Sequence, residues 1–201
     1  MNRGRLLVLE GIDGSGKSTQ LARLAARLEA AGHRVVATRE PYDCEPGRRI
    51  REAARAGEPV SAAQELDWFR AQRALHVRDV ISPALREGAV VVCDRYFVST
   101  AAYQGARGLD PEAILAESEA TFPVPDLVIL LEVEPAEGRA RVDARGGPAE
   151  PLFEDAARQA RVAGLFAAME RPYLVRVDGR GDPDTVAARI EEVVRVRTGL
   201  L

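Results

Sequence analysis

The stretch GIDGSGKSTQ, residues 11–20, contains Lys17, the only lysine in the chain. It matches the pattern G-x-x-x-x-G-K-[ST] and lies between an apolar run and a helical pattern, as a phosphate-binding loop does. Backbone N–H groups of such a loop surround phosphate oxygens, and the following helix directs its positive end at them. We expect Lys17 to bind the outer phosphates of a nucleoside triphosphate and Ser18 to bind magnesium. The loop residues expected to contact the nucleotide are Gly11, Gly14, Ser15, Gly16, Lys17, Ser18 and Thr19.

Apolar runs alternate with helical patterns along the rest of the chain. Runs rich in Val and Leu predict five strands, at residues 6–10, 34–38, 89–94, 127–133 and 173–178. The predicted fold class is therefore α/β: a three-layer P-loop NTPase fold, with a five-stranded parallel sheet flanked by helices and a short lid. We expect a single P-loop domain over residues 1–201, with the lid at about residues 143–160, where glycines and prolines interrupt a helical pattern.

Turn and cap residues refine this prediction. Asp110 and Asp182, each followed by proline, are expected to begin two helices. Pro83 is expected to kink or end the long helical pattern over residues 61–88.

Composition argues against several classes of protein. The formal net charge is −3, whereas a general nucleic-acid-binding domain is strongly basic. No apolar stretch approaches the roughly 18 to 20 residues of a membrane span, and the first residues do not resemble a signal peptide. Cys44 and Cys93 form neither a disulfide nor a zinc pattern. We expect a cytoplasmic protein with no nucleic-acid or membrane partner.

The phosphate-binding loop alone leaves the reaction open, because GTPases, ATPases and kinases share it. A GTPase would be expected to carry a second lysine in an NKxD motif, and this chain has none. Two further motifs follow predicted strands: TREP at residues 38–41 and DRYFVSTAAYQG at residues 94–105. Ligands of parallel sheets bind at the carboxyl ends of strands, so we expect both motifs to meet in one crevice beside the loop.

The loop, TREP and DRYxxSxxAYQG, in this order and spacing, resemble those of bacterial thymidylate kinases in the nucleoside monophosphate kinase group. The resemblance runs from about Leu6 to the C-terminal helix. It implies that the γ-phosphoryl group of ATP is transferred to dTMP with the help of Mg2+, giving dTDP for dTTP synthesis. It also implies small-molecule nucleotide substrates, a homodimer, and a cis bond between Glu40 and Pro41.

The resemblance assigns roles near the phosphates. Arg39 is expected to hold the acceptor phosphate, and Arg95 to lie between this phosphate and the γ-phosphate. Asp94 is expected to orient magnesium, and Asp13 to lie near magnesium and the acceptor sugar. Taken alone, an arginine such as Arg39 would more readily form a surface salt bridge with Glu40 or Glu45.

The resemblance also assigns roles near the acceptor nucleoside. Phe69 and Arg73 lie four apart on one helical face, where the ring would stack on the base and the guanidinium would donate to a carbonyl oxygen. Tyr103 is expected to crowd the 2′ position of the sugar. Gln104 is expected to approach the base, with Ser99 assisting. His33 and His76 are not expected to act in catalysis.

Two departures from the family pattern leave alternatives open. YDCEPGRR follows TREP where the family commonly has GGT, and Gly14 stands where some members have an arginine. The positive charge that neutralises the γ-phosphate is then expected to come from the lid, from Arg145 together with Arg158 or Arg161. One alternative is a kinase of another nucleoside monophosphate or of a deoxynucleoside. Another is a P-loop nucleotide-binding switch with little transfer activity.

Overall fold

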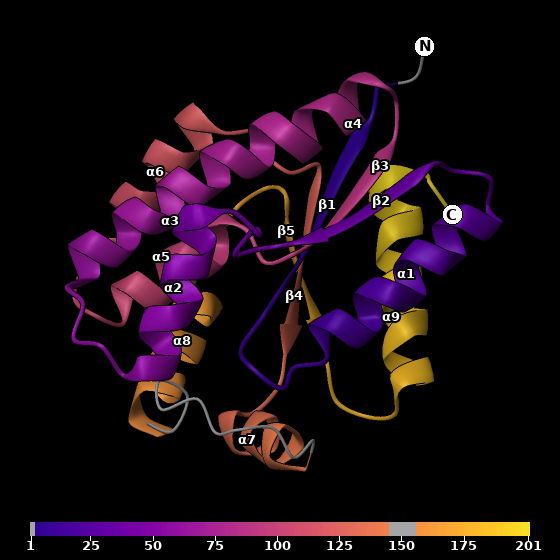
Figure 1. Ribbon diagram of the computed structural model, residues 1–201. Coiled ribbons are helices and arrows are strands. Elements are labelled where there is room, and N and C mark those ends of the chain that lie inside the picture. Colours follow the sequence, from indigo (N-terminus) through magenta and orange to yellow (C-terminus); the bar gives the residue numbers. More distant parts are fainter. Residues whose placement is uncertain (1–2, 145–155) are drawn as a thin grey trace.

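A computed structural model describes residues 3–144 and 156–201, and its centre is a five-stranded parallel sheet (Figure 1). The strands are β1 (Arg5–Glu10), β2 (Val35–Arg39), β3 (Val90–Asp94), β4 (Leu127–Glu132) and β5 (Leu174–Asp178). Their order across the sheet is β2-β3-β1-β4-β5. All five predicted strands are confirmed, and every end lies within one residue of its predicted position.

Helices connect the strands and cover both faces of the sheet (Figure 1). They are α1 (Lys17–Ala30), α2 (Glu45–Ala56), α3 (Ala62–His76), the π-helical turn η1 (Val77–Ile81), α4 (Ser82–Arg86), α5 (Phe97–Gly105), α6 (Pro111–Thr121), α7 (Pro135–Asp143), α8 (Ala156–Ala168) and α9 (Pro183–Thr198). Most of the predicted lid, residues 145–155, lies outside the described residues, while α7 and α8 flank it in the chain.

Two apolar cores form because successive strand residues point to opposite faces of the sheet. On one face Leu7 and Leu9 of β1 pack with apolar residues of α1 and α9. On the other face Leu6 and Val8 pack with residues of α3, α5, α6 and α8. Burial on both faces explains why the central strands β1, β3 and β4 read as continuous apolar runs.

The predicted cap residues also do what the sequence indicates. Asp110 and Asp182 accept hydrogen bonds from backbone N–H groups in the first turns of α6 and α9. The long helical pattern over residues 61–88 is interrupted, as predicted from Pro83. Proline cannot donate the helical hydrogen bond, and the chain forms the π-helical turn η1 just before it.

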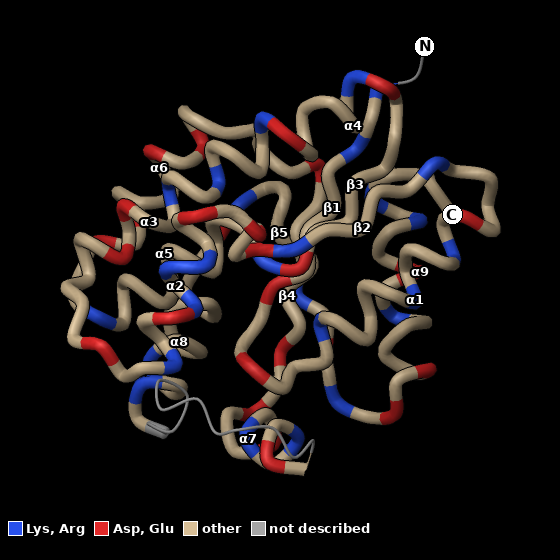
Figure 2. Tube along the Cα trace, viewed as in Figure 1, with Lys and Arg blue, Asp and Glu red and all other residues tan. Residues whose placement is uncertain are grey.

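The register of the sheet brings the motifs to one edge. Asp94 of β3 pairs with Leu9 of β1 on one side and with Arg39 of β2 on the other. Figure 2 shows acidic and basic residues close together at this edge, where β1, β2 and β3 end. Within the described ranges, none of the helices combines the length and apolar character needed to cross a membrane.

Candidate active site

The phosphate-binding loop joins the end of β1 to the start of α1, as predicted. Lys17 is the first residue of α1, and its side chain folds back into the loop. Its Nζ donates to the carbonyl oxygen of Ile12 at 2.8 Å and lies 3.5 Å from the hydroxyl of Ser15. Burial and the nearby charge of Arg95 lower the pKa of Lys17 to about 8, although Asp13 and Asp94 oppose this shift. The loop therefore holds an ammonium group that forms no direct ion pair with any described residue.

Ser18 and Asp94 form the oxygen pair that was predicted to bind magnesium. The hydroxyl of Ser18 donates to Oδ2 of Asp94 at 2.7 Å. Oδ1 of Asp94 is buried and has no hydrogen-bond partner among the described residues. A hydroxyl and a carboxylate are hard oxygen ligands, which magnesium prefers, and it commonly takes only one or two protein carboxylates beside substrate phosphates. The pair therefore fits a magnesium ion, even though no cluster of three metal-binding side chains occurs in the described ranges.

Arg95 joins the phosphate-binding loop to the motif that follows β3. Its Nη2 donates to Oδ1 of Asp13 at 2.6 Å, and its Nη1 donates to the Gly11 carbonyl oxygen at 3.1 Å and to Oγ of Ser99 at 2.9 Å. Tyr103 lies under the guanidinium and donates to Oδ2 of Asp13 at 2.9 Å. The structure thus brings together five predicted residues from loop and motif. Asp13 faces Arg95 and Tyr103 here, and its hydrogen bonds do not include Ser18 or Asp94.

The backbone at Arg95 is unusual because its φ is +68°, in the left-handed region that residues other than glycine seldom adopt. The carboxylate of Glu10, which is fully buried, holds the turn that follows. It accepts from the backbone N–H groups of Tyr96 and Ser99 at 2.8 and 3.0 Å, and also from the Ser99 hydroxyl. Burial raises the pKa of Glu10, while Ser99 and Arg95 counter this effect. Glu10 is a site residue that the sequence reasoning missed.

A cavity of about 170 Å³ opens beside Arg95 and is bounded by α2, α3 and α5. The predicted residues that line it are Asp13, Phe69, Arg73, Arg95, Ser99, Tyr103 and Gln104, and Arg158 of α8 lines it as well. Gln104 donates through Nε2 to Glu65 at 2.6 Å, whereas its buried Oε1 has no partner in the part of the chain that is described. The predicted acceptor residues, apart from Arg39, therefore share one cavity.

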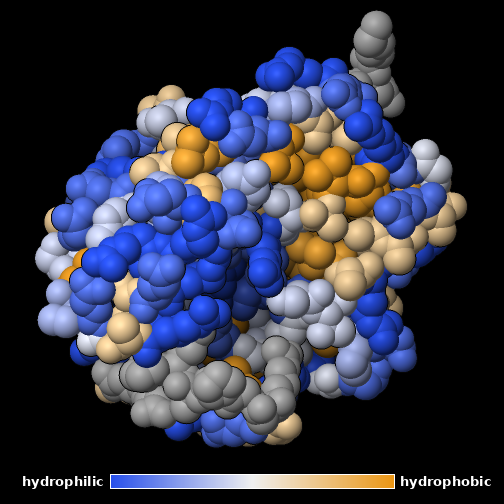
Figure 3. Space-filling model, viewed as in Figure 1, coloured by the Kyte–Doolittle hydropathy of each residue, from blue (hydrophilic) through white to orange (hydrophobic). Residues whose placement is uncertain are grey.

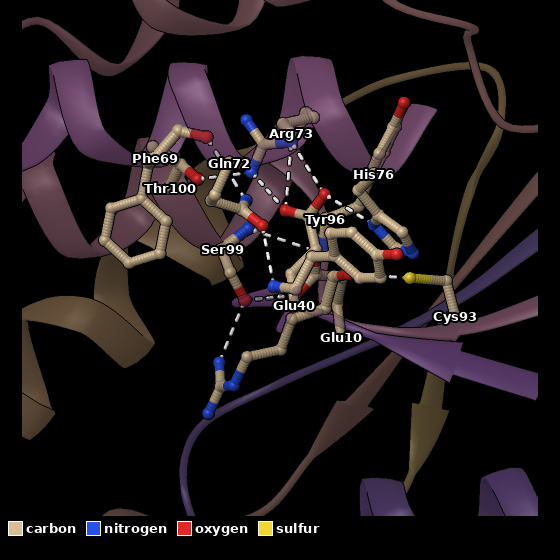
Figure 4. A network of polar contacts seen from close by, with 12 residues as sticks. Glu10, Glu40, Phe69, Gln72, Arg73, His76, Cys93, Tyr96, Ser99 and Thr100 are labelled. Carbon is tan, nitrogen blue, oxygen red and sulfur yellow. Dashed lines mark hydrogen bonds and ion pairs between the residues drawn. The ribbon is translucent and has the colours of Figure 1, made fainter. Parts of the chain in front are cut away.

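The guanidinium of Arg73 is 1% exposed and lies against the carboxylate of Glu40 (Figure 4). Nε donates to both carboxylate oxygens at 3.2 and 3.0 Å, and Nη2 donates to Oε2 at 2.6 Å. Nη2 also donates to the hydroxyl of Thr100 at 2.8 Å. Burial opposes the charge of Glu40, but Arg73 and a hydrogen bond from His76 lower its pKa. Sequence reasoning named Glu40 only as a possible surface partner of Arg39 and as the residue before a cis proline. The structure has the cis bond from Glu40 to Pro41 and places Glu40 in the cavity wall.

Two predicted arginines lie outside this cavity, and a third is not among the described residues. Arg39 is exposed at the end of β2 and lines neither cavity, and its side chain forms no hydrogen bond or ion pair with another described residue. The alternative salt bridge with Glu40 or Glu45 is likewise not formed, because Glu40 pairs with Arg73. Arg161 is exposed on α8, and Arg145 lies outside the described residues.

Arg51 is a further residue that the sequence reasoning missed. It lies on α2, lines the cavity, and donates to the Pro41 carbonyl oxygen at 2.9 Å and to Asp43 at 2.8 Å. It lies two residues after the unusual segment that follows TREP. Its position one helical turn beyond Arg48, on the same helical face, could have indicated that it is a binding residue.

Helix α7 packs directly on the phosphate-binding loop through two glycines. Gly14 has a φ of +78°, and a Cβ built there would lie 2.0 Å from the carbonyl oxygen of Gly138. A Cβ on Gly138 would lie 2.6 Å from the carbonyl oxygen of Asp13. Arg141, one turn later, donates to the carbonyl oxygen of Gly179 at 3.2 Å. No side chain, including an arginine, fits at position 14 unless α7 moves.

A second cavity, of about 500 Å³, lies between the phosphate-binding loop, the ends of β4 and β5, and α8. Gly11 is the only predicted site residue among the described residues that line it. The chemistry of the site therefore centres on the smaller cavity, where the charged and polar groups converge.

Comparison with known proteins gives a consistent result. The sequence profile described as thymidylate kinase matches residues 9–190. A protein named thymidylate kinase from Akkermansia muciniphila is 40% identical over 195 residues, which cover 97% of this chain and 93% of the relative. Thymidylate kinases from Desulfotalea psychrophila and Xanthomonas campestris pv. campestris are 39% and 42% identical, over 92% and 95% of this chain and 91% and 83% of their own lengths.

Proposed function

The chain belongs to the thymidylate kinase family, and we infer that it transfers the γ-phosphoryl group of ATP to dTMP, giving dTDP. The observation that carries this inference is the position of Arg95. Its guanidinium contacts the phosphate-binding loop at Gly11 and Asp13 and also lines the acceptor cavity. A cation at this junction stands between donor and acceptor phosphates, where the negative charge of both must be reduced before they can approach.

The polar groups of the acceptor cavity match the edge of thymine. Nη1 of Arg73 donates to no described side chain or carbonyl, so it can donate to a carbonyl oxygen of the base. Oε1 of Gln104 can accept from an N–H group of the base. Thymine presents a carbonyl oxygen next to an N–H group, whereas cytosine presents an amino group next to a nitrogen acceptor. Phe69 supplies a ring for stacking, and Tyr103 with Asp13 bounds the sugar.

The transfer needs positioning and charge rather than a covalent intermediate. A phosphate oxygen of dTMP attacks the γ-phosphorus in line, and the bond from that phosphorus to the oxygen bridging to the β-phosphate breaks. Lys17 holds the outer phosphates of ATP, and Arg95 lies between the two substrates. Arg51, which lines the acceptor cavity, is proposed to hold the acceptor phosphate, and Arg39 is proposed to join it by turning its exposed side chain inward from the end of β2. No general base is required, because the attacking oxygen is already largely anionic.

Arginines around the lid are proposed to bring further positive charge to the γ-phosphate, as the sequence predicts. Arg158 lines the acceptor cavity, and Arg145 and Arg161 are the other candidates. Arg145→Ala is expected to lower the turnover number by at least about tenfold, given what a lid arginine contributes to phosphoryl transfer. A turnover number equal to that of the wild type would exclude this role.

Ser18 and Asp94 are proposed to hold Mg2+ together with the phosphates of ATP. When bound, the ion adds positive charge beside the phosphate oxygens. The buried Oδ1 of Asp94, which has no partner among the described residues, supports this assignment.

A homodimer is also proposed, through the face beside strand β2. This strand lies at the edge of the sheet, with Val35 and Val36 only partly buried and Ala37 exposed. Figure 3 shows apolar surface over β2 and the neighbouring α4. A second copy of the chain would cover this surface. Light scattering measures the molar mass in solution, which should be that of a dimer for the wild type and shift towards that of a monomer for Val36→Asp.

The acceptor is tested by supplying ATP and magnesium with dTMP, dUMP, dCMP or thymidine and separating the products by ion-exchange chromatography. We expect dTDP from dTMP as the main product. ATP binding without dTDP formation would overturn the proposed function, and faster turnover of another acceptor would correct the substrate.

A further inference from the structure

The guanidinium of Arg73 has one orientation, set by the groups around it (Figure 4). Its Nε and Nη2 are occupied by Glu40 and Thr100, and the rings of Tyr96 and Phe122 lie 5.1 and 5.6 Å from its central carbon. Only Nη1 lacks a partner in the described structure. Because Arg73 lines the acceptor cavity, its orientation decides which atom of a bound base meets an N–H donor.

Glu40 fixes this orientation, and His76 in turn fixes Glu40. His76 is fully buried, and its Nδ1 donates to Oε1 of Glu40 at 3.1 Å. Its Nε2 lies 2.7 Å from the hydroxyl of Thr38 on β2. The ring of Tyr42 stacks on the imidazole, with 4.8 Å between ring centroids and 12° between planes. The carboxylate is therefore held from both sides, by the imidazole and by the guanidinium.

His76 does not line the cavity, so it cannot contact a bound nucleotide. The most direct route from His76 to the acceptor passes through Glu40 and Arg73, both of which line the cavity. Charged groups buried this deeply need their partners, since a carboxylate that loses one hydrogen bond can rotate and carry the guanidinium with it.

We propose that His76 and Glu40 are positioning residues for base selection, because they hold Arg73 so that Nη1 alone faces the acceptor base. This proposal rests on the proposed function, in which that base is thymine. In this orientation the Nη1–H of Arg73 can donate a hydrogen bond to a carbonyl oxygen of the base, whereas an amino group at the same position offers no acceptor. Sites built around a hydrogen bond to the substrate discriminate strongly in this way, because the wrong partner leaves a buried polar group unpaired.

The test compares dTMP with 5-methyl-dCMP, whose base differs at the position where thymine has a carbonyl oxygen and cytosine an amino group. His76→Phe keeps a ring against Tyr42 but removes both hydrogen bonds. We expect it to raise KM for dTMP and to lower the preference for dTMP over 5-methyl-dCMP, measured as the ratio of kcat/KM values, by about tenfold or more, which corresponds to about 1.4 kcal/mol. KM for ATP is expected to stay within about twofold of the wild-type value, since the phosphate-binding loop is separate from this network.

Two further variants separate positioning from a loss of stability. His76→Asn can place an amide N–H near the position of Nδ1, and we expect it to retain most of the preference for dTMP. Tyr173→Phe removes a hydrogen bond to Glu119 away from the cavity, and it is expected to alter neither the preference nor either KM. Thermal unfolding of each variant shows how much stability is lost.

The outcome that overturns the proposal is a His76→Phe protein with a lower Tm and an unchanged preference for dTMP. Equal losses of preference in His76→Phe and His76→Asn would overturn the role of the Nδ1 hydrogen bond. If His76→Phe does not fold, Thr38→Val decides, because it removes the hydroxyl beside Nε2, and an unchanged preference there overturns the proposal. Failure of the wild-type enzyme to make dTDP would instead refute the proposed function.

Discussion

The contact between α7 and the phosphate-binding loop predicts that Gly138→Ala impairs the use of ATP. The added methyl group would lie 2.6 Å from the carbonyl oxygen of Asp13 and 3.2 Å from Cδ1 of Ile12. The first distance is too short for any real contact, so loop and helix must separate by roughly 1 Å, a displacement that can cost about 10²-fold in rate when it misplaces reacting groups. We expect kcat/KM for ATP to fall by about 10- to 100-fold.

The effect on stability is expected to be smaller than the effect on rate. Overpacking a buried position costs about 1–3 kcal/mol. Replacing glycine by alanine within a helix returns about 0.5–1 kcal/mol. The net loss corresponds to a decrease in Tm of a few degrees, at about 2–4 °C per kcal/mol for a chain of this size. The protein therefore stays folded in the assay.

The assay measures initial rates against ATP at saturating dTMP, and then against dTMP at saturating ATP. Gly164→Ala on α8 is the matched control, because a Cβ built at Gly164 has no atom within 4 Å. We expect the control to keep wild-type kinetics and to match or exceed the wild-type Tm. Values of kcat/KM for ATP that agree within twofold for Gly138→Ala and wild type would refute the reasoning, as would an effect confined to dTMP.

Three further predictions concern single groups. Since the pKa of Lys17 is about 8 in the ligand-free protein, the loop loses its ammonium charge above that pH. The apparent Kd of a non-hydrolysable ATP analogue should then rise about tenfold for each further pH unit, and a Kd that stays flat to pH ~9.5 in calorimetric titrations would contradict this. Asp94→Asn should raise the magnesium concentration that gives half-maximal activity by about 10-fold or more and leave KM for dTMP unchanged. Activity measured in a magnesium titration tests this, and an unshifted midpoint would exclude Asp94 from the metal site. Asp110→Ala removes the cap of α6 and should cost about 1 kcal/mol in urea unfolding at wild-type kcat, so an unchanged unfolding midpoint would argue against the cap.

Local patterns were sufficient for the fold. The three central strands β1, β3 and β4 are apolar runs buried on both faces, and the edge strands β2 and β5 are partly exposed runs that still contain consecutive apolar residues. Asp110 and Asp182 accept hydrogen bonds from backbone N–H groups two and three residues away, so their capping role can be predicted from the local sequence. The same holds for the phosphate-binding loop, whose geometry depends on its own glycines.

The site was predictable only where a motif fixes it. Phe69 and Arg73 line one cavity, as their spacing and the family resemblance imply. The partner of Arg73 was not predictable, because the sequence does not say which of Arg39 and Glu40 turns inward after the strand ends. Nor could the sequence indicate that Gly14 meets Gly138, since this contact joins segments that are distant in the chain and depends on how α7 packs.

The burial of Lys17 in the phosphate-binding loop makes its amine suitable for selective chemical labelling. At pH 8 about half of this amine is unprotonated and nucleophilic, whereas an ordinary lysine is almost entirely protonated there. No second lysine competes for an amine-selective reagent, although the α-amino group at the N-terminus also reacts. The mass of the peptide that carries Lys17, after acylation with and without ATP, would therefore report the fraction of loops that hold a nucleotide. By the same reasoning, any acetylation of a lysine in this chain falls on the amine that holds the phosphates, and so abolishes nucleotide binding.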